Sequence, residues 1–274
     1  MREQFPGYGA PRRRSSREVD NGSSPGDIWA LEDDAADRVA QLISRGIASA
    51  SVRLVFNETV ELLGKDLATV APAEWLNDEI INYYGLLVMA RAKTALAAAT
   101  TAAAAGAAPG GGAALRVHYF NSFFFSKLRD IGYSSVRRWS KKFDVFDDLD
   151  MLVFPVHWGA HWTLGCVNVA ARRIEYYDSL LGNEDKEFFR LVRGYVENEW
   201  IKKDRGPMCW DGWTEHYPRD AIPRQLNYYD CGVFTLAMLE SITRSARRFA
   251  FDQSHMDAWR HRIVHELSEG RLIT

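Results

Sequence analysis

The sequence has little cysteine. Its 274 residues include three thiols, Cys166, Cys209 and Cys231, which lie far apart and form no Cys-x-x-Cys pair. An odd, sparse set does not support a disulfide scaffold and is typical of a reducing compartment, so we expect the nucleus or the cytoplasm. The same spacing provides no zinc-ligand pattern, and we expect neither a metal nor another cofactor.

Two further features are missing: an excess of charge of one sign and a long apolar run. The formal net charge is −2, which gives no strong attraction to nucleic acid or to an anionic membrane surface. No apolar stretch approaches the roughly 20 residues of a membrane span, and the first residues lack the apolar region of a signal peptide. We therefore expect no nucleic-acid or membrane partner, and we expect a monomer.

What is present is enough apolar material for one large domain, since 47% of the residues are hydrophobic and nine are Trp. Residues 1–30 are rich in Arg, Ser, Pro and Gly and predict a disordered tail. Its Arg12-Arg13-Arg14 cluster is either a solvated run or an import or docking signal. Residues 31–274 then form the domain. Within it, residues 92–114 are nearly all Ala, Thr and Gly, and we expect a flexible insertion; the alternative is an alanine helix that frays at Gly106.

The spacing of apolar residues predicts an α+β fold. Helical spacing occurs at 35–47, after Asn77 or Asp78, at 184–203, from Cys231 onward and at 256–267. Apolar runs predict an extended segment at 52–63 and strands at 151–157, 162–169, 173–177 and 208–217. In residues 134–142 four cations accompany Trp139, which indicates either an amphipathic helix with a solvated basic face or a partner-binding surface.

Cys231 stands at the start of an apolar helical repeat. Asp230 is a good N-cap, so Cys231 falls in the first turn, where unpaired N–H groups and the helix dipole favour an anion. A thiol in that place loses its proton more readily, and the thiolate is the reactive form. Upstream, Gln225 offers an amide N–H that could stabilise charge on a reacting carbonyl. The alternative for Cys231 is a small buried cysteine at a helix start.

A predicted hairpin brings an imidazole near a carboxylate. Strands 162–169 and 173–177 are joined by a turn around Val169–Ala170, and an antiparallel register about that turn places His161 opposite Asp178. Facing side chains have Cβ atoms roughly 5 Å apart, so the carboxylate can hold the imidazole N–H. Cys231, His161 and Asp178 are thus a nucleophile, a base and a group that orients the base, in the chain order His–Asp–Cys.

Other candidates are weaker. His157 lies at the end of the preceding strand and lacks the register with Asp178, so we prefer His161. His261 and His265 share a helix face without a third ligand, which favours a surface pair over a metal site. Cys209 has no helix behind it and Cys166 lies within a strand, so we assign both a structural role.

Six motifs occur in a specific order. They are Trp75-Leu-Asn-Asp, Phe120-Asn-Ser-Phe-Phe, Val136-Arg-Arg-Trp, His161-Trp, Tyr177-Asp-Ser-Leu, and Gln225 through Asp230-Cys231-Gly. Together they resemble the Ulp/sentrin-specific protease family, cysteine proteases of papain-like fold that act on the ubiquitin-like modifier SUMO. The resemblance covers roughly residues 33–273 apart from the Ala-rich insertion, which departs from the family's usual short connection. It implies a central mixed or antiparallel sheet, with the nucleophile at the N-terminus of a buried helix.

The resemblance also implies roles for single residues. Cys231 resembles the nucleophile, His161 the base, Asp178 the orienting carboxylate and Gln225 the oxyanion donor. Trp75 and Trp162 resemble the tryptophans that cover the Gly-Gly tail of SUMO, and Asp78 the carboxylate that pairs with an arginine of the modifier. The expected activity is maturation of the SUMO precursor and isopeptide release of SUMO from lysines. The alternatives are a protease for another ubiquitin-like modifier and a catalytically silent SUMO-binding module.

Overall fold

The computed structural model describes residues 31–56, 60–106, 114–244, 246 and 248–273. The predicted tail of residues 1–30 therefore lies outside the described residues. The elements in chain order are α1 (Asp33–Ala48), β1 (Arg53–Phe56), β2 (Glu61–Leu63), α2 (Gly64–Ala68), α3 (Asp78–Ala104), β3 (Val117–Tyr119), α4 (Phe123–Asp130), α5 (Tyr133–Val136), β4 (Met151–His157), β5 (Trp162–Asn168), β6 (Arg173–Tyr177), α6 (Asp185–Ile201), β7 (Thr214–His216), α7 (Cys231–Thr243), the short 3₁₀ helix η1 (Gln253–His255) and α8 (Met256–Glu269).

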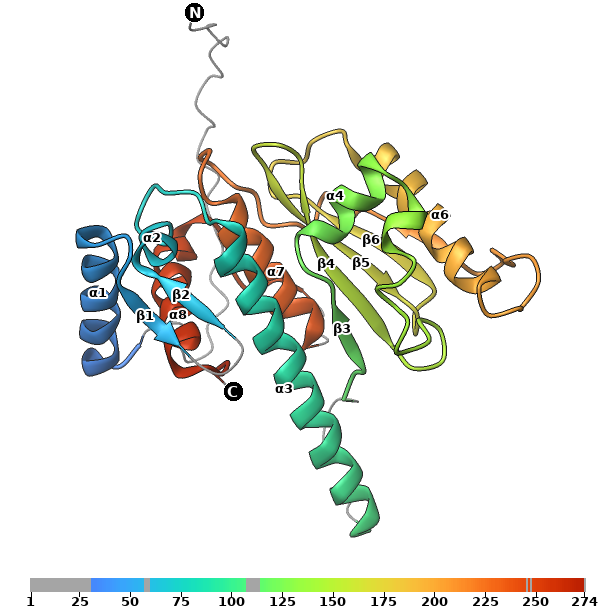
Figure 1. Ribbon diagram of the computed structural model, residues 1–274, viewed down its shortest axis with the longest axis horizontal. Helices are drawn as coiled ribbons and strands as arrows, with labels where there is room; N and C mark the ends of the chain where they lie inside the picture. The colour runs from blue at the N-terminus through green and yellow to red at the C-terminus, as the bar shows by residue number, and fades with distance from the viewer. Residues whose placement is uncertain (1–30, 57–59, 107–113, 245, 247, 274) are drawn as a thin grey trace, which may run out of the picture.

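A five-stranded mixed sheet in the order β3-β4-β5-β6-β7 forms the centre (Figure 1). Its three inner strands pair antiparallel, and the short edge strands β3 and β7 pair parallel with their neighbours. Helix α7 packs against β5 on one face, and α4 and α6 pack against β4 and β6 on the other. Because both faces are covered, β4 is a nearly continuous apolar run, as its sequence predicts. The predicted α+β architecture is confirmed.

The alternation of side chains along the inner strands separates two cores. On one face, residues such as Val153 and Leu164 join the apolar faces of α1, α3, α7 and α8; we call this the helical core. On the other face, Phe154 and Tyr176 join α4 and α6 in a cluster rich in Phe, Tyr and Trp, which we call the aromatic core. The candidate site lies where strands that serve both cores meet the start of α7.

The hairpin of β5 and β6 has a different register from the predicted one. Leu164 pairs with Tyr177 and Asn168 with Arg173. The turn is therefore one residue further along than predicted, and Arg172 adopts a left-handed conformation in it (φ 51°). If this register is continued, Asp178 comes opposite Thr163, and His161 is its diagonal neighbour on the same face. Long side chains bridge such diagonal positions, so the predicted contact survives the error in register.

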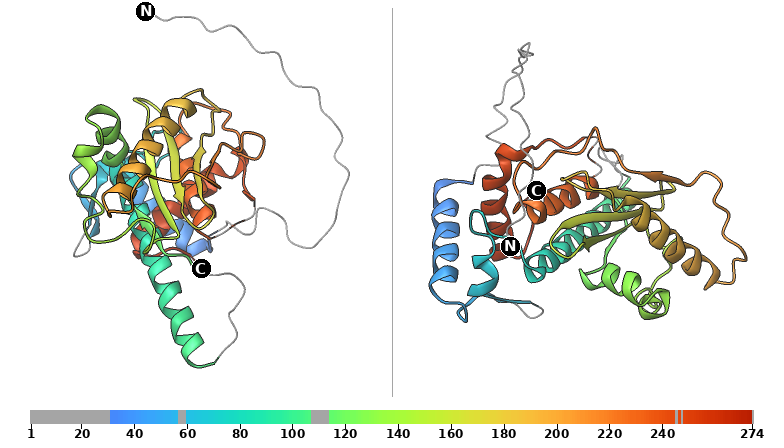
Figure 2. Two further views of the ribbon diagram at one scale, coloured as in Figure 1. Left: turned by 90° about the vertical axis from the view of Figure 1, so that its right-hand side faces the viewer. Right: turned by 90° about the horizontal axis from the view of Figure 1, so that it is seen from above.

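Helix α3 corrects the expectation of a flexible insertion at residues 92–114. It begins at the predicted place, where the Asn77 side chain accepts a hydrogen bond from the N–H of Ile80 (3.1 Å). It then continues to Ala104 and projects from the body of the protein (Figures 1 and 2). Alanine has the highest intrinsic helix propensity, and the helix continues from a packed first half, so its second half needs little packing. The alternative of an alanine helix ending near Gly106 describes this segment better.

Several smaller expectations also change. The strand predicted at 208–217 is confined to β7, and the predicted helix at 134–142 is limited to α5 followed by turns. The extended segment at 52–63 consists of the antiparallel pair β1 and β2. Cys166 is buried within β5 as predicted, whereas Cys209 is exposed, so its assignment to a structural packing role is wrong. In the described part of the chain, no helix is long and apolar enough to cross a membrane.

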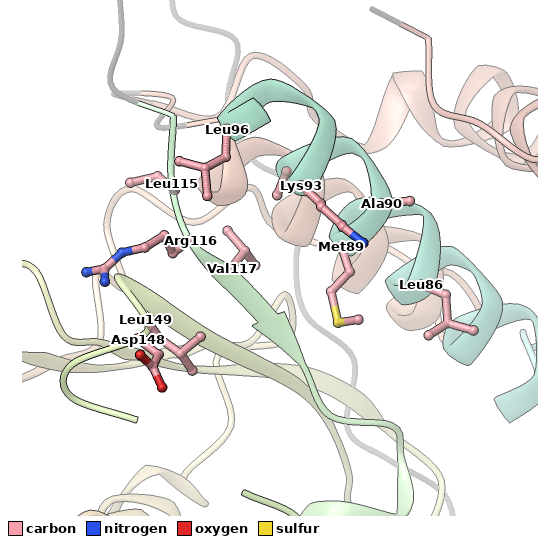
Figure 3. Close-up of a pocket in the computed structure, with 11 residues that line it drawn as sticks. Leu86, Met89, Ala90, Lys93, Leu96, Leu115, Arg116, Val117, Asp148 and Leu149 are labelled. Carbon is pink, nitrogen blue, oxygen red and sulfur yellow. The ribbon is translucent and has the colours of Figure 1, made fainter. Parts of the chain in front are cut away.

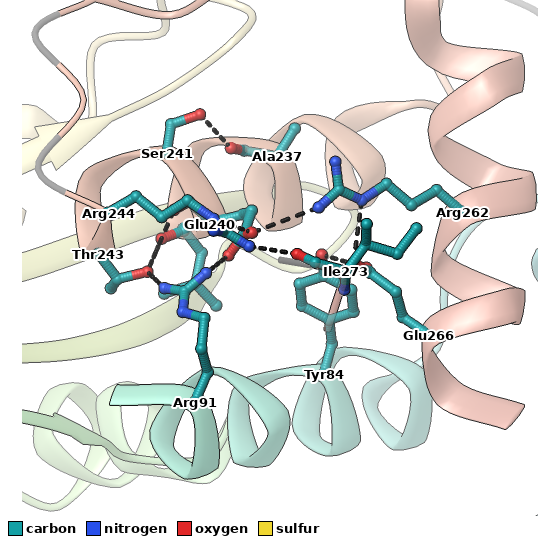
Figure 4. Close-up of polar contacts among 11 residues, drawn as sticks. Tyr84, Arg91, Ala237, Glu240, Ser241, Thr243, Arg244, Arg262, Glu266 and Ile273 are labelled. Carbon is teal, nitrogen blue, oxygen red and sulfur yellow. Dashed lines mark hydrogen bonds and ion pairs between the residues drawn. The ribbon is translucent and has the colours of Figure 1, made fainter. Parts of the chain in front are cut away.

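A buried polar cluster joins three helices of the helical core (Figure 4). The hydroxyl of Tyr84 on α3 donates to Glu266 on α8 (2.7 Å). Glu266 also accepts from Arg262 (2.9 Å), while Glu240 on α7 pairs with Arg91 on α3. Burying unpaired charges is strongly unfavourable, so these mutual pairs hold α3, α7 and α8 in one arrangement.

Candidate active site

Cys231 is the first residue of α7 and is buried, with 2% of its surface exposed. Asp230 occupies the N-cap position as predicted, but its side chain makes no capping hydrogen bond to the helix. Its carboxylate instead accepts hydrogen bonds from Asn227 (2.6 Å), Gln253 (2.7 Å) and Arg260 (2.7 Å). These stronger, partly charged donors explain why the capping expectation is wrong for the side chain. The side chain of Asp230 therefore leaves the N–H groups of the first turn, where Cys231 lies, without a side-chain cap.

His161 and Asp178 flank the β5–β6 hairpin and meet side chain to side chain. The distance from His161 Nε2 to Asp178 Oδ1 is 2.6 Å. The carboxylate also accepts the main-chain N–H groups of Leu180 (2.8 Å) and Gly182 (2.7 Å). Burial of Asp178 opposes ionisation, but the hydrogen bonds from His161 and from these N–H groups outweigh it and lower the pKa of the carboxyl below its usual range. Asp178 is therefore a fixed, ionised partner for the imidazole.

Cys231 is the other side chain that acts on the pKa of His161, so the thiol lies beside the imidazole as a second neighbour besides Asp178. Burial alone would lower the pKa of the imidazole. The hydrogen bond to Asp178 and the neighbouring Cys231, together with the charges of both groups, reverse this effect and raise the pKa of His161 to about 9. The protonated ring is thus favoured next to the sulfur at neutral pH. That arrangement suits a thiolate that attacks and an imidazolium that then gives its proton to a leaving group.

Gln225 lies in the loop before α7, and the surrounding residues fix its amide. Its Oε1 accepts a hydrogen bond from the hydroxyl of Ser179 (2.9 Å), which follows Asp178 directly. Its Nε2 donates to the main-chain oxygen of Asn227 (2.8 Å) and lies 3.3 Å from Asn227 Oδ1. An amide NH₂ has two hydrogens, so one is firmly engaged and the second makes only the longer contact. The contacts with Ser179 and Asn227 thus hold the amide in one orientation.

Trp75, Asp78 and Trp162 line one cavity of about 320 Å³. Trp75 is half exposed at 50%, whereas Trp162, next to His161, is only 6% exposed. The indole N–H of Trp162 donates to the main-chain oxygen of Leu76 (3.0 Å). The cavity therefore has one fixed aromatic wall and one wall open to solvent, with the Asp78 carboxylate at the first turn of α3.

The other histidines considered as candidates do not belong to the group formed by Cys231, His161 and Asp178. His157 ends β4, its ring centre lies 4.3 Å from that of Trp162, and burial lowers its pKa. His261 is exposed and His265 half-buried on α8, and no cluster of three or more metal-binding side chains occurs among the described residues. A larger cavity of about 420 Å³ lies between α3 and β3 (Figure 3). Its apolar lining contains no predicted site residue, so it is not the candidate site.

Sequence reasoning missed the supports of the site. A Cβ atom on Gly232 would lie 2.9 Å from Cβ of Leu76. Leu76 belongs to the loop of residues 69–77 between α2 and α3, which we call the Trp75 loop. Only glycine lets the start of α7 approach this loop so closely. Ser179 and Arg260 were also unassigned. The motif Tyr-Asp-Ser-Leu was a signal for Ser179, but Arg260 lies far along the chain in a helix whose pattern indicated only packing.

A nucleophilic thiol at a helix start, a base and a buried carboxylate behind it define the class of the cysteine proteases. Residues 111–272 match the family described as "Ulp1 protease family, C-terminal catalytic domain". The chain therefore belongs to the Ulp1 protease family, as the resemblance predicted.

Related proteins support this assignment. A sentrin-specific protease of Caenorhabditis elegans is 34% identical over 247 residues, which are 90% of this chain and 32% of that protein. Sentrin-specific protease 5 of Mus musculus is 37% identical over 208 residues, or 76% of this chain and 24% of that protein. This chain thus spans a third or less of these relatives. The crystal structure of the C-terminal Ulp1 protease domain in complex with Smt3, the yeast ortholog of SUMO, is similar with a TM-score of 0.68 at 24% identity. It covers 88% of this chain and 96% of that one, which confirms the predicted papain-like fold.

Proposed function

We propose that the chain is a thiol protease that cleaves after the C-terminal Gly-Gly of SUMO. It would mature the precursor and release SUMO from the lysines of target proteins. The observation that carries the proposal is the hydrogen bond of 2.6 Å between Asp178 and His161, whose imidazole also has the Cys231 thiol as a neighbour that raises its pKa. The names of the relatives, sentrin-specific proteases and a Ulp1 domain bound to Smt3, support the choice of modifier.

The chemistry follows from the positions of the side chains. The Cys231 sulfur attacks the carbonyl carbon of the terminal glycine, and its oxygen takes up negative charge. The second amide hydrogen of Gln225 stabilises that charge, because a preorganised donor acts where the charge develops. Imidazolium His161 gives its proton to the leaving amine, and the C–N bond breaks. Water, deprotonated by the now neutral His161, then hydrolyses the thioester and restores the thiolate and the imidazolium.

The two tryptophans provide a physical reason for Gly-Gly. A backbone that passes between two indoles has no room for a Cβ, and only glycine lacks one. Exposed Trp75 and buried Trp162 both line the cavity and would form these two walls. Asp78 at its rim would pair with an arginine of the modifier. We further propose a nuclear or cytoplasmic monomer without nucleic-acid or membrane partners; its free cysteines fit such a compartment.

Reactive probes that end in Gly-Gly would test the proposal. One probe is made with each ubiquitin-like modifier, and each is incubated with the chain and with Cys231→Ala as the control. We expect rapid labelling of Cys231 by the SUMO probe and none of the variant. Preferential labelling by ubiquitin would reject SUMO as the substrate. Binding of SUMO without labelling by any probe would favour the silent binding module.

A further inference from the structure

Arg260 on α8 has no part in the mechanism above, yet it is among the most buried side chains, with 1% of its surface exposed. Its guanidinium donates to Asp230 Oδ1 through Nε (3.1 Å) and Nη2 (2.7 Å). A buried charge is tolerated only where partners satisfy it. Asp230 is the residue directly before the nucleophile, so α8 is hydrogen-bonded to the residue next to Cys231.

The remaining hydrogens of the same guanidinium reach the loop that carries Trp75. Nη1 donates to the main-chain oxygen of Ala71 (2.9 Å), and Nη2 to that of Glu74 (2.8 Å). Leu76 in this loop contacts both Trp162 and the start of α7, as described above. One arginine thus bonds at once to the residue before Trp75 and to the residue before Cys231.

The Asp230 carboxylate also connects Arg260 to the loop that holds Gln225, the proposed oxyanion donor. Asn227 donates to Asp230 Oδ2 (2.6 Å), and the main-chain oxygen of Asn227 accepts the Gln225 amide (2.8 Å). Gln253 donates to the same carboxylate oxygen and also accepts the N–H of Leu226 (2.8 Å). The loop from Gln225 to Asp230 is therefore held from both sides.

The base has separate supports. Within the described residues, none of the hydrogen bonds of Arg260 reaches His161 or Asp178, which are held by the sheet and by the N–H groups of the β6–α6 loop. We infer that Arg260 is a positioning residue that fixes the Trp75 wall and the Gln225 amide relative to Cys231. Arg260 thereby affects how well the Gly-Gly tail is bound and how well the oxyanion is stabilised. It does not act on the Cys231–His161 pair. This inference rests on the proposed function.

The chemistry of arginine suits this task. Its planar group presents five N–H donors in fixed directions, and here they serve a carboxylate and several carbonyl oxygens at the same time. Lysine keeps the positive charge but offers one flexible ammonium, which cannot reach both loops in this geometry. Arg260→Lys therefore separates charge from positioning.

The test compares Arg260→Lys with Arg262→Lys. Arg262 lies on the same helix, is 6% exposed and is paired with Glu266 and Glu240 away from the site. Kinetics use a fluorogenic substrate that ends in the Gly-Gly of whichever modifier the unmodified chain cleaves. We expect Arg260→Lys to lower kcat/KM about 100-fold, with a higher KM and a lower kcat, because small misplacements near reacting groups have effects of this size. Arg262→Lys should stay within about twofold once both variants are assayed well below their Tm.

A small thiol reagent separates positioning from general damage. Iodoacetamide needs neither the Trp75 wall nor the Gln225 amide. It should therefore alkylate Cys231 in Arg260→Lys at the same rate as in the unmodified chain. Equal losses of activity in both lysine variants, or slower alkylation in parallel with lower turnover, would overturn the inference and leave Arg260 a stabilising residue only.

Hydrogen exchange tests the inference without any turnover. Amides of residues 70–77 and 225–231 should exchange faster in Arg260→Lys than in Arg262→Lys, and unchanged exchange would overturn the inference. If the unmodified chain cleaves no modifier while these segments respond as expected, the proposed function fails and the positioning network stands.

Discussion

The two halves of the candidate site are held by different kinds of interaction. His161 and Asp178 flank paired strands, where main-chain hydrogen bonds continue residue after residue and the aromatic core covers the other face. Cys231 begins a helix at which two loops and α8 converge without a shared ladder, and charged side chains such as Asp230 and Arg260 make the connections. Behind them, the cluster around Glu240 and Glu266 continues the same pattern (Figure 4).

This difference teaches where the site is sensitive to substitution. Main-chain hydrogen bonds do not depend on side-chain identity, so the pairing of β5 with β6 does not depend on any single polar side chain. Where separate segments meet, side chains make the connections, and the substitution of one such side chain removes a connection. The nucleophile side should therefore respond to single polar substitutions that leave the base side intact.

Removing the sulfur gives the largest effect. Cys231→Ala leaves both supports in place but abolishes covalent catalysis, so kcat/KM should fall by at least about 10⁴-fold. Conjugates should still bind, because the Trp75–Trp162 cavity is unchanged. Steady-state kinetics and pull-down of conjugated protein measure the two properties. Turnover close to that of the unmodified chain would show that the thiol is not the nucleophile.

The base side is probed by Asp178→Asn, which should lower kcat by roughly 10³–10⁴-fold. His161 has its pKa raised from 6.5 to about 9, so activity that needs the imidazolium should fall as pH rises through about 9. The substitution removes the negative charge of Asp178, which helps to raise this pKa, and the alkaline limb of kcat/KM should move toward 6.5.

The same raised pKa affects stability. Its contribution is fully present below pH 6.5, the unfolded value, and is lost as pH rises through about 9. Unfolding by urea across this range, with Asp178→Asn as the comparison, checks the sign. If the alkaline limb of kcat/KM stays near pH 9 in Asp178→Asn, Asp178 is not a cause of the raised pKa of His161.

On the nucleophile side, Gln225→Ala should reduce kcat by about 10²–10³-fold with little change in KM, since an oxyanion donor acts mainly in the transition state. Ser179→Ala is a milder companion, because it removes only the hydrogen bond that orients the amide. A Gln225 effect confined to KM would point to substrate binding instead.

The smallest effect concerns the contact between the start of α7 and the Trp75 loop. In Gly232→Ala the new methyl would press on Leu76, and overpacking of this kind costs about 1–3 kcal/mol. KM should rise with it. Gly194→Ala on α6 is the matched control: nothing lies within 4 Å of its added Cβ, so it should be neutral or about 0.5–1 kcal/mol more stable. Equal behaviour of the two variants would remove the close approach as an explanation.

The sequence predicted elements and the site better than the connections between them. Strands β4 and β6 were placed from their apolar patterns, and Cys231, His161 and Asp178 come together despite the wrong register, because diagonal positions share a face. The alanine helix was underestimated, since propensity alone decides where no packing pattern exists. The role of the Asp230 carboxylate could not be foreseen.

The reason lies in sequence distance. Hydrophobic periodicity reports which face of an element is covered, but not which distant polar group meets it. Arg260 appeared only as part of an amphipathic helix, although it is the most connected polar side chain beside the site. Such partners are set by tertiary packing, which no local pattern records.

The bond from Arg260 to Val70 spans 190 positions of the sequence. During synthesis, α8 (Met256–Glu269) is made after both the loop of residues 69–77 and Cys231. Domains complete such distant contacts only when both segments are available. The loop of residues 69–77 and the start of α7 therefore stay without this shared support until α8 has been synthesised.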